Sequence, residues 1–116
     1  MVELILPWPP SVNHYWVHAR GRAFISKAGR AFRDAVIWEC KAKRVKRQTG
    51  RLGVFVQVRA PDRRRRDLDN LNKAALDALQ HAGVYDDDSQ IDALTIHRGP
   101  LLEGGALYIR VQEIPG

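Results

Sequence analysis

Residues of opposite charge stand side by side near the middle of the chain. The stretch PDRRRRDLDNLNKAALDAL, residues 61–79, places four consecutive arginines directly before the acids Asp67 and Asp69. Carboxylates are the oxygen ligands that hard cations such as Mg²⁺ take in proteins, and guanidinium groups bind phosphate through paired hydrogen bonds. The pattern therefore indicates a site that holds a metal ion and a phosphate-containing ligand together.

Asp67 and Asp69 are two residues apart and lie at the start of a predicted helix over about 69–81. Where the chain is still extended, side chains at i and i+2 point the same way, so the two carboxylates can converge on one point. Two carboxylates a few ångströms apart repel each other unless a cation lies between them. The alternative is that these aspartates only cap the helix, since aspartate is common at N-caps.

A third carboxylate is expected from the sequence VYDDDSQI, which contains three consecutive aspartates ending at Asp88. We predict that Asp88 converges with Asp67 and Asp69, either through an antiparallel neighbouring strand or through a loop over residues 83–90 that doubles back. Eight residues span at most about 26 Å, which is enough for that path. The alternative is a solvated turn, for which clustered aspartates are typical.

The basic residues of this stretch complement the acids. Hydrolysis of a phosphodiester needs a metal that activates water, and cations that hold the flanking backbone against the negative site. Lys73 lies one helical turn beyond Asp69, where it can contact the scissile phosphate or position the attacking water. The alternative is a surface ion pair, because Asp69, Lys73 and Asp77 have the spacing of a helical ladder. The arginines of residues 63–66 are expected to bind the phosphates.

The pattern of apolar residues predicts an α+β or α/β fold in which helices cover a sheet. Strands are expected at residues 2–6, 54–58, 91–97 and 106–114, with a hairpin at 15–25. Ser26 is a candidate N-cap for a helix over about 27–47, and Gly83 is a candidate C-terminal stop for the helix over 69–81.

Helical spacing also predicts which side chains face the core. The first helix is expected to bury Ala28, Ala31, Phe32, Ala35, Val36 and Cys40. The second is expected to bury Leu71, Ala75, Ala78, Leu79 and Ala82.

The chain of 116 residues is long enough for one domain, which we expect to span residues 1–116. It carries 19 lysines and arginines against 13 acids, a net charge of +6, which favours a polyanionic partner such as nucleic acid. The N-terminal sequence shows no signal-peptide pattern, and no apolar run approaches the ~20 residues of a membrane span. A single cysteine, Cys40, has no internal partner. These features predict a cytoplasmic protein.

Four motifs follow one another in an order and spacing that resemble the RusA family of Holliday-junction resolvases. They are LPWPPSVNHYW, ISKAGRAFRDAV, PDRRRRDLDNLNKAALDAL and AGVYDDDSQI. The similarity covers nearly the whole chain and is weakest over residues 43–52 and in the last strands. The combination of D-L-D-N-L-x-K with a downstream D-D-x-Q is the most specific part of the resemblance.

The resemblance implies a two-fold homodimer that requires Mg²⁺, or Mn²⁺ in its place, and nicks two opposed strands of a four-way DNA junction. Its fold would be the α+β fold of that family, with two main helices packed on a mixed sheet. The enzyme would be cytoplasmic and nucleoid-associated, of bacterial or phage origin, and would act in DNA recombination and repair. Paired cuts related by two-fold symmetry suit two identical sites on a C₂ dimer.

The resemblance also assigns roles to individual residues. The metal-binding and catalytic carboxylates would be Asp67, Asp69 and Asp88, with Asp87 as a secondary acid and the role of Asp86 open. Lys73 would be the catalytic lysine. The residues that bind DNA would be Arg63, Arg64, Arg65, Arg66, Asn70 and Asn13. Two alternatives stay open: a non-catalytic basic module that binds nucleic acid, its aspartates being only caps and turns, and a nuclease for flaps or other branched DNA.

Overall fold

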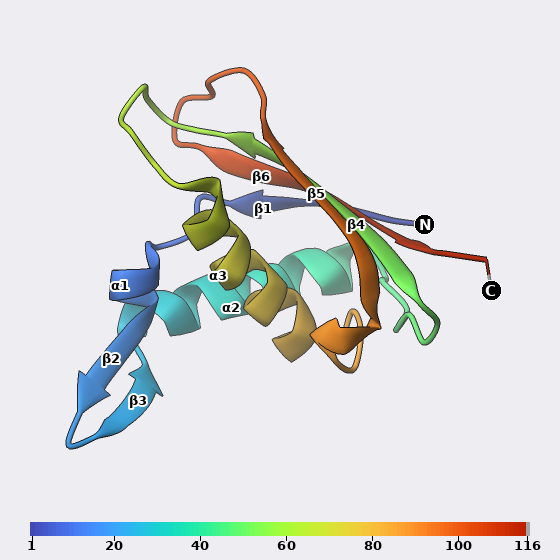
Figure 1. Cartoon of the computed structure of the whole chain (residues 1–116), viewed down its shortest axis with the longest axis horizontal. Helices are drawn as coiled ribbons and strands as arrows, with labels where there is room; N and C mark the ends of the chain where they lie inside the picture. The colour runs from blue at the N-terminus through green and yellow to red at the C-terminus, as the bar shows by residue number, and fades with distance from the viewer. Residues whose placement is uncertain (116) are drawn as a thin grey trace.

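A four-stranded mixed sheet with two helices against one face forms the centre of the molecule (Figure 1). The computed structural model describes residues 1–115, apart from the side chain of Val12. The strands lie in the order β1 (Val2–Pro7), β6 (Ala106–Glu113), β4 (Leu52–Arg59) and β5 (Ile91–Arg98). The predicted α+β fold with two main helices is confirmed. Gly116, the last residue of the expected domain, lies outside the described residues.

The pairing of β4 with β5 decides the path of the chain between them. β1 and β4 each pair antiparallel with β6, whereas β4 and β5 run parallel, with Leu52 opposite Ile91 and Val58 opposite Arg98. A parallel neighbour requires a crossover that returns the chain to the starting end of the sheet, and α3 (Leu68–His81) forms that crossover. The start of β5 therefore lies at the opposite end of the sheet from the point where β4 stops.

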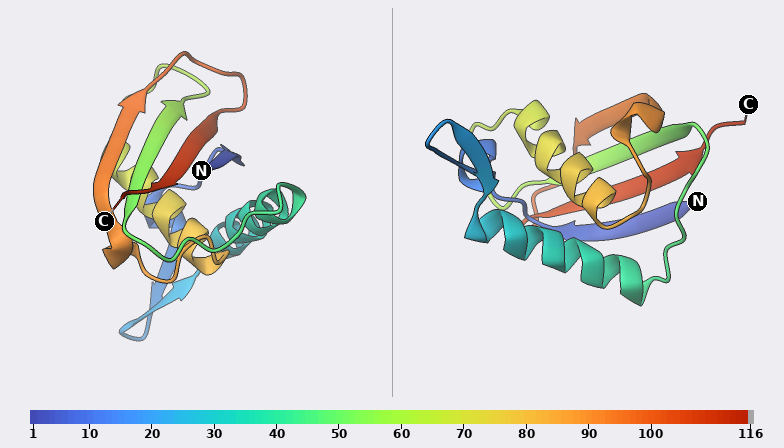
Figure 2. Two further views of the ribbon diagram at one scale, coloured as in Figure 1. Left: turned by 90° about the vertical axis from the view of Figure 1, so that its right-hand side faces the viewer. Right: turned by 90° about the horizontal axis from the view of Figure 1, so that it is seen from below.

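Alternation along the strands separates a covered face of the sheet from an open one. The buried residues of β4 alternate with more exposed ones and are Leu52, Val54, Val56 and Val58. Two helices, α2 (Lys27–Ala42) and α3, cover this face, and its burial supplies most of the hydrophobic core. No helix of residues 1–115 covers the opposite face, which carries Phe55 and Tyr108 (Figure 2).

α2 begins where the sequence predicts and ends earlier. Ser26 is the N-cap, and its hydroxyl accepts a hydrogen bond from an amide of the first turn at 2.9 Å. The helix ends before the basic segment 43–47, so the predicted C-terminal boundary is wrong. A Schellman motif ends it: the amide of Val45 donates to the carbonyl of Cys40, and Arg44 takes the left-handed conformation with φ 53°. Glycine usually takes this position, so an arginine there gave no sequence signal of a helix end.

The buried face of α2 also differs from the predicted one. As expected, the helix buries Phe32, Val36 and Cys40. The alanines that were assigned to the core lie on its exposed or half-exposed side instead: Ala28, Ala31 and Ala35. Gly29 decides the orientation, because a Cβ atom at this position would lie 2.6 Å from the carbonyl oxygen of Tyr15. Only glycine allows so close an approach, and with Gly29 inward the alanines face outward.

α3 follows the sequence prediction closely. It buries the predicted residues Leu71, Ala75, Ala78 and Leu79, together with Asn72 and Ala74, whereas Ala82 is half-buried. It ends in a second Schellman motif, in which Gly83 with φ 82° holds the left-handed position. In the described part of the chain, none of the helices is long and apolar enough to span a membrane.

A short hairpin projects from the helical layer. After the one-turn helix α1 (Val12–Tyr15), the strands β2 (Trp16–Ala19) and β3 (Arg22–Ile25) pair antiparallel and form a separate two-stranded sheet. This confirms the predicted hairpin. Figure 1 shows that it extends away from the four-stranded sheet, and we call it the arm, residues 16–25.

Candidate active site

Asp67 and Asp69 lie at the N-terminus of α3, next to the arginine run. Asp67 holds the N-cap position in an extended conformation, with φ −83° and ψ 126°, but the helix already begins at Leu68, so the i, i+2 convergence of Asp67 and Asp69 stays a prediction. Within residues 1–115 its carboxylate accepts no capping hydrogen bond, so capping alone does not account for it. Asp69 follows in the first turn with its side chain 77% exposed. Both carboxylates are therefore accessible to a ligand at the positive end of the helix dipole.

Lys73 lies beside these acids on the surface of α3. Its Nζ atom is 3.6 Å from Oδ2 of Asp69, and both side chains are largely exposed. An exposed ion pair of this length contributes little to stability, because solvent screens it and two long side chains lose freedom. The contact predicted as the structural alternative is thus present, and it leaves the ammonium group accessible to DNA.

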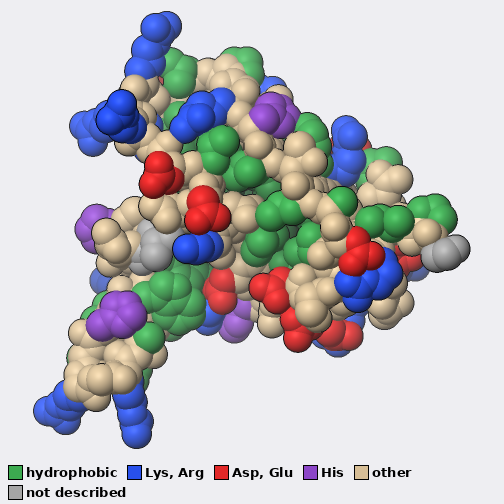
Figure 3. Space-filling model, in the orientation of Figure 1, with side chains coloured by type: hydrophobic (Ala, Val, Ile, Leu, Met, Phe, Trp, Pro, Cys, Tyr) green, Lys and Arg blue, Asp and Glu red, His purple; other side chains and the backbone are tan. Residues whose placement is uncertain are grey.

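A cavity of about 420 Å³ opens next to Asp67. It is lined by Trp8, Pro9, Ser11, Arg65, Arg66, Asp67, Asn70 and Leu71. The loop after β1 and the loop before α3 therefore meet at this point, although they are far apart in sequence. In Figure 3 acidic and basic side chains lie close together over this end of the molecule, above the arm. The cavity combines negative and positive groups with the apolar surface of Trp8 and the prolines.

Asp62 fixes the shape of the arginine loop, residues 60–67. Its carboxylate accepts a hydrogen bond from the amide of Arg64 at 2.9 Å and pairs with the guanidinium of Arg66 at 2.9 Å. The Arg64 amide and the Arg66 charge hold the pKa of Asp62 below its ordinary value. Arg66 also lies over the ring of Trp8, at 5.2 Å. Arg66 is therefore part of the loop's internal structure as well as a candidate for phosphate binding.

The other three arginines of the loop extend into solvent. The side chain of Arg64 is 83% exposed. Its Nε atom lies 3.8 Å from Oδ2 of Asp62, which is a long distance for an ion pair. Arg63 and Arg65 are exposed and form no ion pair with any of residues 1–115. These side chains are accessible to a polyanion, and their binding to phosphates stays a prediction.

The acids of the run 86–88 serve different purposes. Asp87 is the N-cap of the short 3₁₀ helix η1 (Asp88–Gln90), where its carboxylate accepts a hydrogen bond from the amide of Ser89 at 2.9 Å. This hydrogen bond lowers the pKa of Asp87. Asp86 pairs with Arg47 at 2.8 Å on the surface. The alternative of a solvated turn therefore accounts for both, whereas Asp88 forms no ion pair within the described chain.

Asp88 does not join Asp67 and Asp69 in one chain. The amide of Asp88 donates to the side chain of Gln80 at 3.1 Å, which places it beside the C-terminal end of α3. A helix rises ~1.5 Å per residue, so Gln80 lies about 16 Å from Asp69 along the axis. Residues 1–115 contain no cluster of three His, Cys, Asp or Glu side chains that could hold a metal. The predicted convergence within one chain is wrong, because β4 and β5 are parallel and the loop after α3 does not double back.

The two asparagines assigned to DNA lie at this end of the molecule. Asn70 is exposed on the first turn of α3 and lines the cavity next to Asp67. Asn13 is exposed on α1, a helix that packs against α3. The structure is compatible with both assignments, which stay predictions.

Sequence reasoning missed a polar cluster of Tyr15, Arg33 and Asp77, which we call the brace. The hydroxyl of Tyr15 donates to the carboxylate of Asp77, and Nε of Arg33 lies 3.0 Å from that hydroxyl and 3.0 Å from Asp77. Burial raises the pKa of Tyr15, and the hydrogen bond to Asp77 raises it further. Asp77 was interpreted as a rung of a surface ladder with Lys73; it pairs instead with Arg33 on α2. No pattern in the sequence links these three residues.

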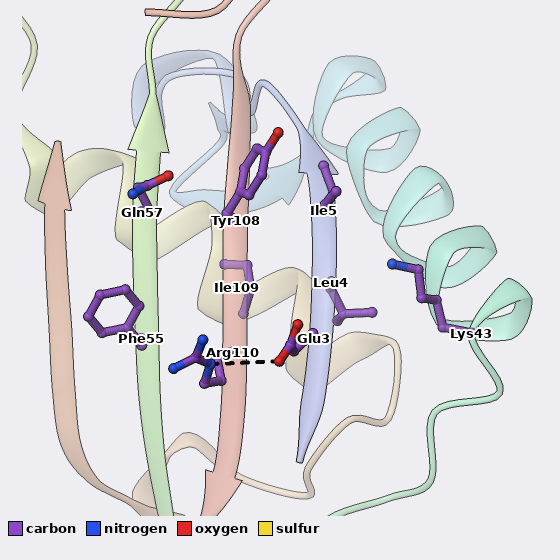
Figure 4. A pocket seen from close by; sticks show the side chains of 9 residues that line it. All are labelled: Glu3, Leu4, Ile5, Lys43, Phe55, Gln57, Tyr108, Ile109 and Arg110. Carbon is purple, nitrogen blue, oxygen red and sulfur yellow. Dashed lines mark ion pairs between the residues drawn. The ribbon is translucent and has the colours of Figure 1, made fainter. Parts of the chain in front are cut away.

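A second cavity, of about 350 Å³, lies on the open face of the sheet (Figure 4). Its lining includes Phe55, Tyr108 and an ion pair between Arg110 and Glu3, at 3.9 Å. The helices lie on the other face of the sheet, so this cavity is separate from the acids of α3. It contains one carboxylate, that of Glu3, and does not offer a set of metal ligands.

Comparison with known proteins agrees with the sequence resemblance. The family model described as Endodeoxyribonuclease RusA matches residues 7–112. The protein named Crossover junction endodeoxyribonuclease RusA from Escherichia coli strain K12 is 42% identical over 118 residues, covering 97% of this chain and 94% of the relative. Relatives of the same name from Enterobacteria phage 82 and Shigella sonnei strain Ss046 show the same identity and coverage.

Proposed function

This chain belongs to the RusA family of crossover junction endodeoxyribonucleases, and we propose that it resolves four-way Holliday junctions by metal-dependent hydrolysis of two opposed phosphodiesters. The observation that supports a metal site most directly is Asp67, which takes the N-cap position of α3 without using its carboxylate as a cap. Action in the cytoplasm in association with the nucleoid, and an origin in a bacterium or a phage, stay predictions.

The donor set at this end of α3 fits a hard divalent cation such as Mg²⁺ or Mn²⁺. Asp67 and Asp69 would hold the ion together with Asp88, and the bound ion would activate water and neutralise the leaving oxygen. Mg²⁺ often takes only one or two carboxylates together with waters and substrate phosphates, so Asp67 and Asp69 could hold it by themselves. The family resemblance adds Asp88 as a third ligand, and that carboxylate would have to come from elsewhere. Asp87 is a weaker candidate than Asp88, because its carboxylate already caps η1.

A second copy of the chain would supply the missing acid. Asp67 and Asp88 lie toward opposite ends of α3, so a two-fold axis that sets two α3 helices antiparallel brings Asp88 of the partner subunit toward Asp67 and Asp69. Each dimer then contains two identical sites, each built from both chains. Two such sites suit a junction whose opposed strands must be cut as a pair.

The edge of the sheet next to α3 is suited to this contact. β5 is an edge strand, and its residue Leu94 lies opposite the buried Val54 of β4. Leu94 is therefore on the same face of the sheet as the residues that α2 and α3 cover. Leu94 is nevertheless 43% exposed, because no element of residues 1–115 lies over it. Dimerisation along β5 and α3 would bury it. Leu94→Asp is therefore expected to produce a monomer in sedimentation and to abolish cleavage, whereas a dimeric, active Leu94→Asp would exclude this edge.

The basic residues around the acids would bind the DNA backbone. Lys73 would contact the scissile phosphate, where its charge offsets the negative charge that develops during hydrolysis. Arg63, Arg64 and Arg65 would hold flanking phosphates, and Arg66 would do so from its fixed position over Trp8. Asn70 and Asn13 would add polar contacts at the same end of the molecule.

Cleavage of defined substrates tests this function. The wild-type protein is expected to nick a synthetic four-way junction symmetrically in Mg²⁺, and to cut a flap and a plain duplex far more slowly. Asp67→Asn and Asp88→Asn should retain or improve junction binding, since each removes a negative charge, but lose cleavage. Asp86→Asn is the matched control, because Asp86 pairs with Arg47 at the surface. Preference for the flap would identify another branched-DNA nuclease, and metal-independent binding without cleavage would identify a binding module.

A mixed dimer tests whether the site is shared between subunits. Asp67→Asn and Asp88→Asn chains, carrying different tags, would be refolded together and the mixed species isolated. With shared sites, one site of the mixed dimer combines both substitutions and the other is intact, so single-strand nicking returns. With each site contained in one chain, both sites are damaged and the mixture stays inactive.

A further inference from the structure

The arm is held rigidly at its base. The amide of Ser26 donates to the carbonyl of Tyr15 at 2.9 Å, which ties the end of β3 to the start of β2. Tyr15 is 1% exposed and belongs to the brace, so the base of the arm is fixed to Asp77 on α3. An isolated two-stranded hairpin is marginally stable in water, and these contacts give the arm a defined direction. Figures 1 and 2 show it at the same end of the molecule as the N-terminus of α3.

The two faces of the arm have different environments. Trp16 and Ile25 form the cross-strand pair at its base and pack against the core. The next pair along, Val17 and Phe24, points to the opposite face, because successive side chains of a strand alternate. Val17 is 48% exposed and Phe24 is 50% exposed. The arm therefore presents an apolar pair to solvent although it has a second face that packs against the protein.

The tip of the arm is basic. Arg20 and Gly21 form the turn with φ 51° and 72°, so both are left-handed, as in a type I′ hairpin. Arg22 begins β3 directly after the turn and lies on the same face of the arm as Phe24, because the two residues are two apart along the strand. Residues 4–33 contain Arg20, Arg22, Lys27, Arg30 and Arg33 but no Asp or Glu. This charge favours a polyanion over a second copy of this chain as the ligand of the arm.

We propose that the arm inserts Val17 and Phe24 between bases at the branch point of the junction and unstacks them, while Arg20 and Arg22 bind the phosphates on either side. A two-stranded ribbon fits a DNA groove, and apolar side chains of groove-binding proteins wedge between base steps. Because the strands part at a branch point, opening a base step there should cost less stacking than in plain duplex, so the wedge would select a junction. This inference rests on the proposed function, because it assigns branch-point recognition to a part of the same enzyme.

Fluorescence of 2-aminopurine placed at the branch point measures unstacking directly. In the absence of divalent metal, wild-type protein is expected to raise the fluorescence of a synthetic junction. Val17→Ser/Phe24→Ser should bind through phosphates with little loss but leave the signal unchanged, and in Mg²⁺ it should cleave at least about tenfold more slowly. Phe24→Trp, which keeps a large apolar ring, should retain both the fluorescence signal and the cleavage rate of the wild type. Arg20→Gln/Arg22→Gln should lower the affinity for the junction and reduce the slope of log affinity against log salt concentration.

Ile5→Ser is the matched control, because Ile5 is also 48% exposed but lies on the open face of the sheet. It should unstack and cleave like wild type. Full unstacking by Val17→Ser/Phe24→Ser would overturn the inference. So would a change from dimer to monomer in sedimentation, which would make the pair a contact between subunits. If wild type unstacks the junction but never cleaves it, the proposed catalysis fails while the arm's role stands; if it does not bind junctions, both fail.

Discussion

The hydroxyl of Tyr15 donates a hydrogen bond to the carboxylate of Asp77, which joins the base of the arm to the helix that carries Asp69. Arg33 of α2 pairs with the same carboxylate at 2.9 Å. Three elements from separate parts of the chain are thus fixed by one partly buried polar cluster. Such networks strengthen when every member is satisfied and are costly when one is removed.

Tyr15→Phe is expected to lower the free energy of unfolding by about 1–2 kcal/mol, because it leaves part of a buried network without its partner. Urea denaturation monitored by circular dichroism measures the change. Tyr108→Phe is the control: Tyr108 packs under Arg59 at 4.0 Å, and its hydroxyl forms no hydrogen bond with residues 1–115. Equal losses in the two variants would show that the hydroxyl of Tyr15 has no special role.

Tyr15 and Tyr85 are expected to resist ionisation at alkaline pH. Burial raises the pKa of both hydroxyls, helped for Tyr15 by the hydrogen bond to Asp77 and for Tyr85 by the charges of Asp88 and Asp77. An unfolded tyrosine ionises near pH ~10, so above that pH the unfolded state loses protons first and stability falls as pH rises toward the folded pKa. Thermal melting from about pH 8 to 11 and the absorbance of tyrosinate measure this.

The alkaline loss should be smaller in Tyr15→Phe, which removes one of the two raised groups. A folded protein in which both buried hydroxyls ionise near the ordinary value would contradict the prediction, because it would show that neither is shielded from water.

Arg65→Gln and Arg66→Gln are expected to differ. Arg65 is exposed and lines the cavity, so its loss should leave the melting temperature unchanged and reduce the slope of log affinity against log salt by about 0.9. Arg66 pairs with Asp62 at 2.9 Å and lies over Trp8, so its loss should also lower the melting temperature. Salt-dependent binding and thermal melting of both variants check this. Identical melting temperatures would remove the structural role of Arg66.

Asn72→Leu is expected to stabilise the protein. Asn72 is 6% exposed on α3, and its Oδ1 atom has no hydrogen-bond partner among the described residues. An unsatisfied buried acceptor is costly, so an apolar side chain of similar volume should raise the free energy of unfolding by about 1 kcal/mol. Urea denaturation provides the measurement, with Asn13→Leu as a control that should bring no gain, because Asn13 is exposed. A loss of stability in Asn72→Leu would indicate that the amide has a partner in solution.

Local patterns predicted much of the fold and the position of Asp67 and Asp69 at the start of α3. Alternating valines located β4, Ser26 located the start of α2, and Gly83 located the end of α3. Asp67 and Asp69 were placed correctly because their positions depend on only a few neighbouring residues. Each of these features is decided by periodicity, capping or turn chemistry, which the sequence shows directly.

The features that were missed depend on contacts between distant segments. Nothing near Asp88 reveals that β5 pairs parallel to β4, which separates it from Asp67. The end of α2 was missed because Arg44 takes a position usually held by glycine. The outward alanines of α2 follow from the contact of Gly29 with Tyr15, which belongs to another element. Spacing along the chain carries no information about any of these relationships.

The crossover between β4 and β5 has a consequence for where a dimer would cut. α3 contains 14 residues and is about 21 Å long. With two such helices antiparallel, the two catalytic centres would lie at opposite ends of the pair, and helix length would determine the distance between incisions. One inserted residue would lengthen that distance by ~1.5 Å and rotate Asp88 by about 100° relative to Asp67. In such a dimer both incisions would shift together, so the length of this single helix would set where both strands are cut.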